Sequence, residues 1–176
     1  LTYSGTHTSL ASFLPDQTIV ITGLSKSHAM TGWRIGYILG PIPFIKEVVK
    51  THQYMVTSPS SSSQYGALAA MLHGQGDCDI MKVEYQQRRD YLAKELRRLG
   101  FEVASPDGAF YLFAKIPAKC GTDSWAFVRD LAKNAKVALI PGVSFGPGGE
   151  GYVRFSYAAS MENLTEVVAR LEKYLA

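Results

Sequence analysis

The sequence predicts an α/β fold in which a mostly parallel sheet is followed by a smaller α+β unit. Residues 18–22 form a continuous apolar or β-branched run between turn-forming residues, which is typical of a strand buried in a parallel sheet. Strand and helix patterns then alternate as far as Gly100. Beyond Gly100, strand patterns over 101–104 and 109–114 flank the turn signal at 106–108, which indicates a hairpin.

The remaining elements of the first part follow from capping and periodicity. A second strand is expected over 34–39, closed by Gly40 and Pro41, and a helix over 43–50 has Pro43 near its first turn. The serine-rich stretch 58–63 is interpreted as a loop and helix cap that lead into a helix over 64–72. The longest helix is expected over 79–99, because its apolar residues recur at spacings of three and four before Gly100.

The second part is expected to contain two more helices and two more strands. A helix over 123–132 has Thr122 or Asp123 as its cap, and strands are expected over 137–140 and 152–157. Ser160 caps a final helix, in which Leu164, Val168, Leu171 and Leu175 share one face. The predicted organisation is therefore a first region over 1–78, a connecting helix over 79–99 and a small domain over 100–176.

Composition limits the classes of partner. The chain has 176 residues, 47% of them hydrophobic, and its 18 Lys+Arg against 15 Asp+Glu leave a formal charge of +3. This small, dispersed charge gives no reason to expect nucleic acid or an anionic membrane as a partner. Cys78 and Cys120 lie far apart without metal-ligand spacing, so no disulfide framework and no metal site are expected, and the default compartment is the cytoplasm.

Lys26 is the first candidate functional residue, because it lies just beyond the predicted strand over 18–22. A loop lysine is ordinarily a surface residue. However, ligands of open α/β sheets bind at the carboxyl ends of strands, and the segment around Lys26 offers no acidic partner. A lysine in such a site loses its proton more readily and can attack a carbonyl. We therefore expect Schiff-base chemistry at Lys26.

Arg34 is the second candidate, although an ordinary ion pair at a strand start is the alternative. A guanidinium binds phosphate through two parallel hydrogen bonds, whereas an ammonium acts as a point charge. The hydroxyl groups of Ser25, Ser27 and Thr31 could add hydrogen-bond donors. An aldehyde that also carries a phosphate is pyridoxal 5′-phosphate, which is the cofactor that these residues suggest.

The run over 23–37, GLSKSHAMTGWRIGY, resembles the cofactor attachment segment of the class I/II aminotransferases, a pyridoxal-phosphate-dependent family of fold type I. This resemblance implies that Lys26 holds the cofactor covalently and that Arg34 binds its phosphate. It also suggests Ser25 as a phosphate ligand, although many relatives place that serine three positions before the lysine, where this chain has Gly23.

The resemblance extends to the end of the chain. Residues 141–146 and 152–160 are similar to the family's stretch that carries the arginine for the substrate α-carboxylate, which implies that role for Arg154. An arginine within an otherwise apolar strand is costly unless it meets a carboxylate, either from the protein or from a ligand. Phe145 would then line the substrate pocket, with a core position as its alternative.

Family members are roughly twice the length of this chain, so the chain resembles their C-terminal half. Residues 1–78 would be the end of the large, cofactor-binding domain, and 100–176 the small domain. The resemblance places the groups that contact the cofactor's ring before Leu1. The isolated chain is therefore expected to hold pyridoxal phosphate weakly or not at all, and not to turn over.

The leading hypothesis is a pyridoxal-phosphate-dependent aminotransferase of amino-acid metabolism, which transfers an amino group between an amino acid and a 2-oxo acid and is a homodimer at full length. Another fold type I enzyme, such as a lyase, decarboxylase or synthase, is the nearer alternative, because one fold serves several reactions. The more distant alternative is a ligand-sensing domain of a transcription regulator.

Overall fold

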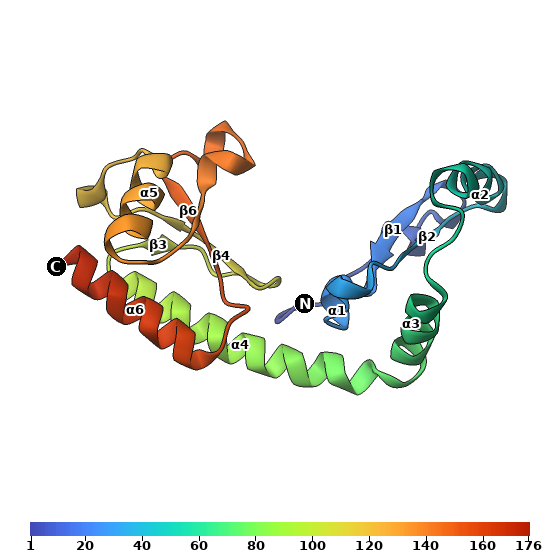
Figure 1. Ribbon diagram of the computed structural model, residues 1–176, viewed down its shortest axis with the longest axis horizontal. Helices are drawn as coiled ribbons and strands as arrows, with labels where there is room; N and C mark the ends of the chain where they lie inside the picture. The colour runs from blue at the N-terminus through green and yellow to red at the C-terminus, as the bar shows by residue number, and fades with distance from the viewer. The chain divides into compact units, whose positions relative to one another are not determined.

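The computed structural model describes residues 1–176, which form two compact units. Unit 1 comprises Leu1–Ser4 and Lys82–Ala176, and unit 2 comprises Gly5–Met81. Each unit contains both helices and strands, and each has its own antiparallel sheet (Figure 1).

Unit 2 is built around a two-stranded sheet. Strand β1 (Val20–Gly23) leads into the single-turn helix α1 (Leu24–Ser27), and β2 (Gly36–Leu39) pairs antiparallel with β1. Helices α2 (Ile42–Val56) and α3 (Ser61–His73) follow, and α4 (Gln75–Arg98) begins in this unit. Short 3₁₀ turns occur at Leu10–Ser12, Pro15–Gln17 and Thr31–Trp33.

The prediction of a mostly parallel sheet is wrong. Val20 lies opposite Leu39, and Gly23 lies opposite Gly36, so the two strands of unit 2 run in opposite directions. Residues 24–35 connect them with one turn of α-helix and one 3₁₀ turn, which is too little chain for the helical crossover that parallel neighbours require. The sequence predicts both strands, but it does not predict that they run in opposite directions.

Unit 1 contains a four-stranded sheet in the order β3-β4-β6-β5, antiparallel throughout. Its strands are β3 (Glu102–Val103), β4 (Tyr111–Lys115), β5 (Ile140–Pro141) and β6 (Tyr152–Ser156). The strand expected over 137–140 is thus mostly irregular, because only its last residue pairs with β6. Helices α5 (Ser124–Asn134) and α6 (Met161–Leu175) complete the unit together with the end of α4.

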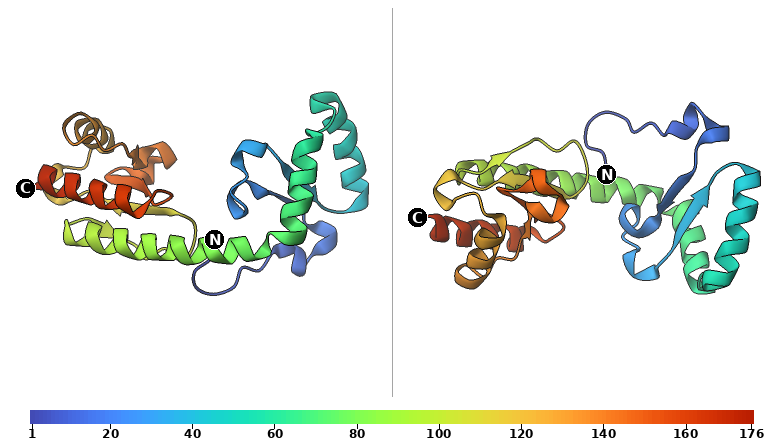
Figure 2. Two further views of the ribbon diagram at one scale, coloured as in Figure 1. Left: turned by 60° about the horizontal axis from the view of Figure 1, so that its bottom comes forward. Right: turned by 90° about the horizontal axis from the view of Figure 1, so that it is seen from above.

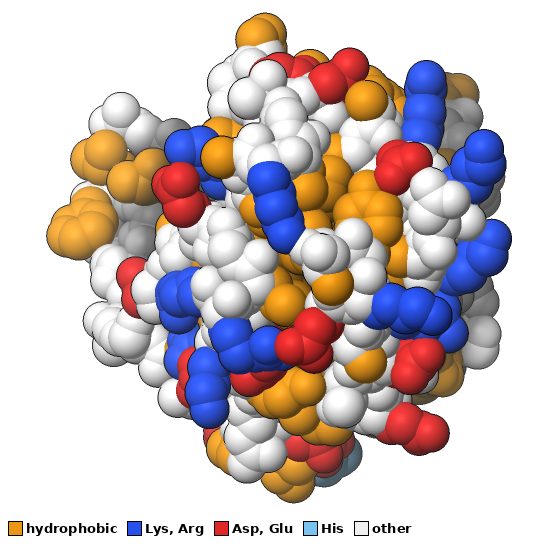
Figure 3. All heavy atoms as spheres, turned by 90° about the vertical axis from the view of Figure 1, so that its left-hand side faces the viewer, with side chains coloured by type: hydrophobic (Ala, Val, Ile, Leu, Met, Phe, Trp, Pro, Cys, Tyr) orange, Lys and Arg blue, Asp and Glu red, His pale blue; other side chains and the backbone are white.

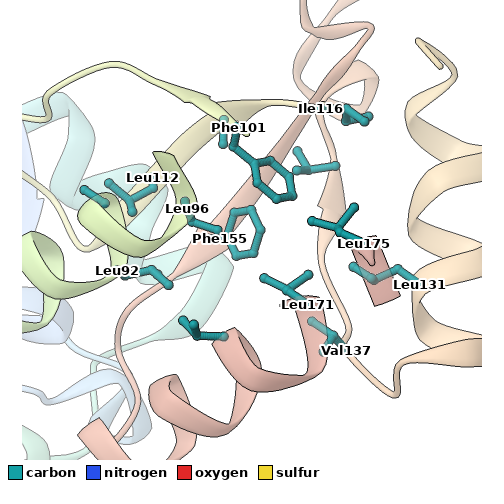
Figure 4. Packing of buried hydrophobic residues seen from close by; sticks show 14 of the residues in the cluster. Leu92, Leu96, Phe101, Leu112, Ile116, Leu131, Val137, Phe155, Leu171 and Leu175 are labelled. Carbon is teal, nitrogen blue, oxygen red and sulfur yellow. The ribbon is translucent and has the colours of Figure 1, made fainter. Parts of the chain in front are cut away.

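The core of unit 1 lies between one face of this sheet and its helices. Leu112, Ala114, Val153 and Phe155 alternate along β4 and β6 on that face, which α4, α5 and α6 cover. Phe155 projects toward Leu96 and Phe101 (Figure 4), and its ring meets that of Phe101 edge-on at 5.6 Å between centroids. The opposite face of the sheet therefore takes no part in this core.

The helix termini of unit 1 agree with the sequence. Asp123, rather than Thr122, caps α5 by accepting a hydrogen bond from the Ala126 N–H, and Ser160 caps α6 by accepting one from the Asn163 N–H. Helices α4 and α6 lie side by side (Figure 2), and an ion pair between Arg98 and Glu172 links them on their exposed side. The caps satisfy backbone N–H groups in the first turns of α5 and α6.

The first four residues belong to unit 1. The Tyr3 N–H donates to the Asp107 carbonyl at 2.7 Å, and the Tyr3 hydroxyl donates to the Ala109 carbonyl at 2.7 Å. The fully buried Tyr157 donates to the same carbonyl at 3.0 Å. The Arg89 guanidinium lies 4.5 Å from the centre of the Tyr3 ring. The N-terminal segment thereby joins the hairpin turn between β3 and β4 to helix α4.

The surface of unit 1 carries mixed charge. On the face shown in Figure 3, Lys and Arg side chains are interspersed with Asp and Glu, in keeping with the formal charge of +3. None of the helices combines the length and apolar character needed to cross a bilayer.

Candidate active site

Residues 23–37, which carry Lys26 and Arg34, begin where β1 and β2 come closest. A Cβ on Gly23 would lie 3.0 Å from the Ile35 carbonyl oxygen, and one on Gly36 would lie 2.9 Å from the Thr22 carbonyl oxygen. These two glycines therefore allow the strands to converge at one end. Lys26 follows on α1, and its side chain is exposed. Arg34 precedes β2 at the same end of the sheet.

Arg34 occupies an unusual backbone conformation. Its φ of 52° and ψ of 47° lie in the left-handed region, where non-glycine residues are uncommon. Its Nη1 donates a hydrogen bond to the Thr31 carbonyl at 2.9 Å, and the Thr31 hydroxyl donates to the Ser25 carbonyl at 2.8 Å. Ser25 and Arg34 are thus joined through Thr31 into one folded turn. Such strained positions cluster at binding and catalytic sites.

Helix α3 packs against this turn through contacts with Trp33. The buried Ser63 hydroxyl donates to the Trp33 carbonyl at 2.7 Å, directly before Arg34. A Cβ on Gly66 would lie only 2.6 Å from the Trp33 ring, so a glycine is needed at this position. Neither Ser63 nor Gly66 is predicted as a site residue from the sequence. The serine-rich stretch was interpreted as a loop and cap, whereas α3 already begins at Ser61.

His28 also has defined partners. Its Nδ1 lies 2.9 Å from the Ser27 hydroxyl, and its Nε2 lies 3.6 Å from the Cys78 thiol of α4. The same thiol donates to the Ser27 carbonyl at 3.0 Å. These contacts hold the residues that follow Lys26 against the first turn of α4.

Arg154 and Phe145 lie in unit 1, on the sheet face opposite the core. Arg154 is half-buried in β6, one of the two central strands, and is opposite Phe113 of β4. Its guanidinium carbon lies 4.2 Å from the centre of the Tyr111 ring and 4.8 Å from that of Phe145. Phe145 belongs to a short 3₁₀ turn, Gly142–Phe145, and is exposed.

The guanidinium of Arg154 has no acceptor within the protein: it makes no hydrogen bond and no ion pair, and its contacts are with the two aromatic rings. Lys115 on the same sheet face is different, because it pairs with Glu102 at 3.0 Å. That hydrogen bond and the charge of Glu102 raise the pKa of Lys115. Of these two cations, Arg154 is the one left to receive an external anion.

The donors in residues 23–37 fit a phosphorylated aldehyde chemically. Lys26 provides a primary amine for the carbonyl carbon, and Arg34 provides a guanidinium for the phosphate. Ser25, Ser27 and Thr31 contribute hydroxyl groups to the same short segment. Lys26, Ser25 and Arg34 belong to unit 2, whereas Arg154 and Phe145 belong to unit 1.

The sequence profile of the family described as "Aminotransferase class I and II" matches residues 3–171. The chain belongs to this family. Its members use pyridoxal 5′-phosphate, so the donors found around Lys26 agree with the cofactor of the family.

Individual relatives carry the match along almost the whole chain. The chain is 49% identical over 175 residues to a probable N-acetyl-LL-diaminopimelate aminotransferase of Bacillus subtilis, covering 99% of this chain and 44% of that protein. It is 40% identical over 172 residues to an aspartate aminotransferase of Pyrococcus horikoshii, covering 96% and 44%. The chain therefore spans about half the length of the curated relatives it matches.

Solved structures agree with the fold. The aromatic aminotransferase of Pyrococcus horikoshii OT3 superposes with a TM-score of 0.92 at 38% identity, over 99% of this chain and 48% of that one. An aspartate aminotransferase from Thermotoga maritima gives a TM-score of 0.89 at 34% identity, over 99% and 45%. The chain is thus a mixed α/β part of the fold type I aminotransferase architecture.

Proposed function

We propose that the whole protein containing this chain transfers an amino group between an amino acid and a 2-oxo acid. The relatives matched along nearly the whole chain are named aspartate, aromatic and N-acetyl-diaminopimelate aminotransferases, which supports this reaction class. In this proposal, residues 1–78 belong to the cofactor-binding domain and residues 100–176 form the small domain. Residues 79–99 are the helix that connects the two domains. The active enzyme is a homodimer of the cytoplasm.

Lys26 and Arg34 are assigned to the cofactor. Lys26 Nζ would hold the cofactor at its carbonyl carbon and, as a free amine, would take the proton from the substrate Cα as general base. Arg34, with Ser25 as an additional ligand, holds the phosphate. When bound, pyridoxal phosphate supplies an electron sink for the charge left on Cα.

Arg154 is assigned to the substrate α-carboxylate, with Phe145 lining the pocket beside it. The observation that carries this assignment is the half-buried guanidinium on a central strand, in contact with two rings and without an acceptor in the protein. A carboxylate would satisfy two of its N–H groups at once. Fixing that carboxylate also fixes the direction of the Cα–H bond relative to the base.

The test is an assay of the whole enzyme with and without a 2-oxo acid acceptor. Lys26→Ala should lower amino transfer by about 10²-fold or more, because the variant lacks both the attachment point and the base. Lys50→Ala is the matched control, since Lys50 is an exposed lysine that pairs with Glu47. Retained transfer in Lys26→Ala would refute the assigned role. Consumption of amino acid that does not depend on the acceptor would instead indicate a lyase or decarboxylase.

A further inference from the structure

We infer that Tyr111 is the residue that positions the Arg154 guanidinium for a carboxylate, through the face of its ring. This inference rests on the proposed role of Arg154 and adds a residue that the sequence analysis did not single out. The ring of Tyr111 would hold Arg154 in one place and leave its guanidinium N–H groups available to the ligand.

The Arg154 guanidinium is in contact with the Tyr111 ring. The guanidinium carbon lies 4.2 Å from the centre of the Tyr111 ring, within the range in which a cation is attracted to the electron-rich face of an aromatic ring. The contact is with the ring and not with a hydrogen-bond acceptor atom, so the N–H groups of the guanidinium remain for a ligand. A carboxylate from the protein would hold the arginine equally well, but it would occupy those N–H groups.

The register between β4 and β6 brings Tyr111 next to Arg154. Tyr111 lies opposite Ser156 on the neighbouring strand, and Phe113 lies opposite Arg154, so Tyr111 and Arg154 are diagonal neighbours on one face. Diagonal neighbours are within reach of aromatic and long side chains. The other face of both strands is packed into the core of unit 1 through Leu112 and Phe155, which fixes the backbone that carries the contact.

Tyr111 and Phe145, the two rings near Arg154, differ in how firmly they are held. Phe145 lies 4.8 Å from the guanidinium carbon on a short turn and is 53% exposed, whereas Tyr111 is half-buried on a paired strand. The Phe110 ring packs against Tyr111 at 4.5 Å between centroids. Tyr111 is therefore the more firmly held of the two rings. Its hydroxyl makes no hydrogen bond, so the ring alone carries the effect.

The experiment uses the ¹⁵N-labelled 176-residue chain and follows the side-chain Nε–Hε signal of Arg154 by NMR while propionate replaces chloride at constant ionic strength. Propionate should shift this signal saturably. Tyr111→Leu, which keeps an apolar residue on the strand but removes the ring, should weaken propionate binding by about two- to five-fold. Tyr111→Phe should bind propionate as the unmodified chain does, because it keeps the ring.

A second substitution separates the ring's charge distribution from its shape. Replacement of Tyr111 by pentafluorophenylalanine retains the size of the ring and reverses the polarity of its face, so it should weaken propionate binding although packing is conserved. This variant also decides the matter if Tyr111→Leu fails to fold. Equal affinity in the unmodified chain and in the pentafluorinated chain would overturn the inference.

The variant Arg154→Gln distinguishes this inference from the proposed function. If propionate still perturbs the neighbouring signals of β4 and β6 with the same affinity in Arg154→Gln, the carboxylate role of Arg154 fails, and the role of Tyr111 fails with it. If Arg154→Gln abolishes binding and the Tyr111 variants do not change it, the carboxylate role stands and the positioning role of Tyr111 is wrong.

Discussion

Unit 1 and unit 2 differ in where their large apolar side chains lie. The buried cluster between sheet and helices belongs entirely to unit 1, whereas Leu24 and Met30 are the buried hydrophobic residues of unit 2. In unit 2, side chains such as Ile21, Ile42 and Tyr54 are 76%, 71% and 92% exposed. Unit 1 therefore has the core expected of an independent domain, and unit 2 does not.

This difference bears on the two groups of candidate residues, one in each unit. Arg154 lies on a sheet whose other face is fully packed, so its surroundings are fixed by unit 1 itself. Lys26 and Arg34 lie on a turn that depends on a few hydrogen bonds and on the contact of Trp33 with α3. The surroundings of Arg154 should therefore be preformed in this chain, and the turn that carries Lys26 and Arg34 should be held less firmly.

The largest predicted effect comes from truncating the core of unit 1. Leu96→Ala should lower the free energy of unfolding of unit 1 by about 2–5 kcal/mol, because Leu96 is fully buried. The matched change in unit 2, Ile21→Ala, should alter stability by no more than about 0.5 kcal/mol. In variants that keep only Trp125 or only Trp33, tryptophan fluorescence follows the urea unfolding of unit 1 or of unit 2. Equal losses from both substitutions would contradict the comparison.

The elements of unit 1 were largely predictable because their signals are local. Asp123 and Ser160 begin helices through side-chain contacts with residues three positions on, and Gly100, with a φ of 92°, ends α4 as expected. The alternation along β4 likewise separates Leu112 from Phe113. Such signals need no knowledge of the rest of the fold.

The errors arose where the outcome depends on distant residues. The run over 18–22 looks the same whichever way its partner runs, and only the short connection over 24–35 argues against a parallel pair. The contact of Tyr111 with Arg154 depends on the register between β4 and β6, which their separate sequences do not reveal. Ser63 and Gly66 were missed for the same reason, since their partner Trp33 lies on another element.

The second-largest predicted effect is a loss of stability of unit 1 at alkaline pH. Burial and then the hydrogen bond to Asp130 raise the pKa of Tyr174 to about 12, and burial also raises the pKa of Tyr3 and Tyr157. An unfolded tyrosine has a pKa of about 10, so this stabilisation is complete below about pH 10 and is lost between about pH 10 and 12. The near-ultraviolet absorbance of tyrosinate should therefore show a late group among the ten tyrosines, which titrates as unit 1 unfolds. A single transition near pH 10 in the folded chain would refute this.

The smallest predicted effect compares two serines at helix N-termini. Ser160→Ala should destabilise unit 1 by about 1 kcal/mol, because the Ser160 hydroxyl accepts the Asn163 N–H of α6. Ser60→Ala in unit 2 should change stability less, since the Ser60 side chain makes no capping hydrogen bond at α3. Thermal unfolding of the two variants checks this. A larger loss for Ser60→Ala would show that α3 is capped in a way that the structure does not contain.

The central claim is that Lys26 and Arg34 together form a site for a phosphorylated aldehyde. It is tested most directly by treating this chain with pyridoxal phosphate, reducing the adduct with borohydride so that even weak occupancy is captured, and mapping the labelled lysines by mass spectrometry. Lys26 should be labelled ahead of Lys50 at limiting cofactor, and this preference should disappear with Arg34→Gln or with pyridoxal that lacks the phosphate. Labelling of Lys26 and Lys50 to the same extent, whether or not Arg34 is present, would contradict the account.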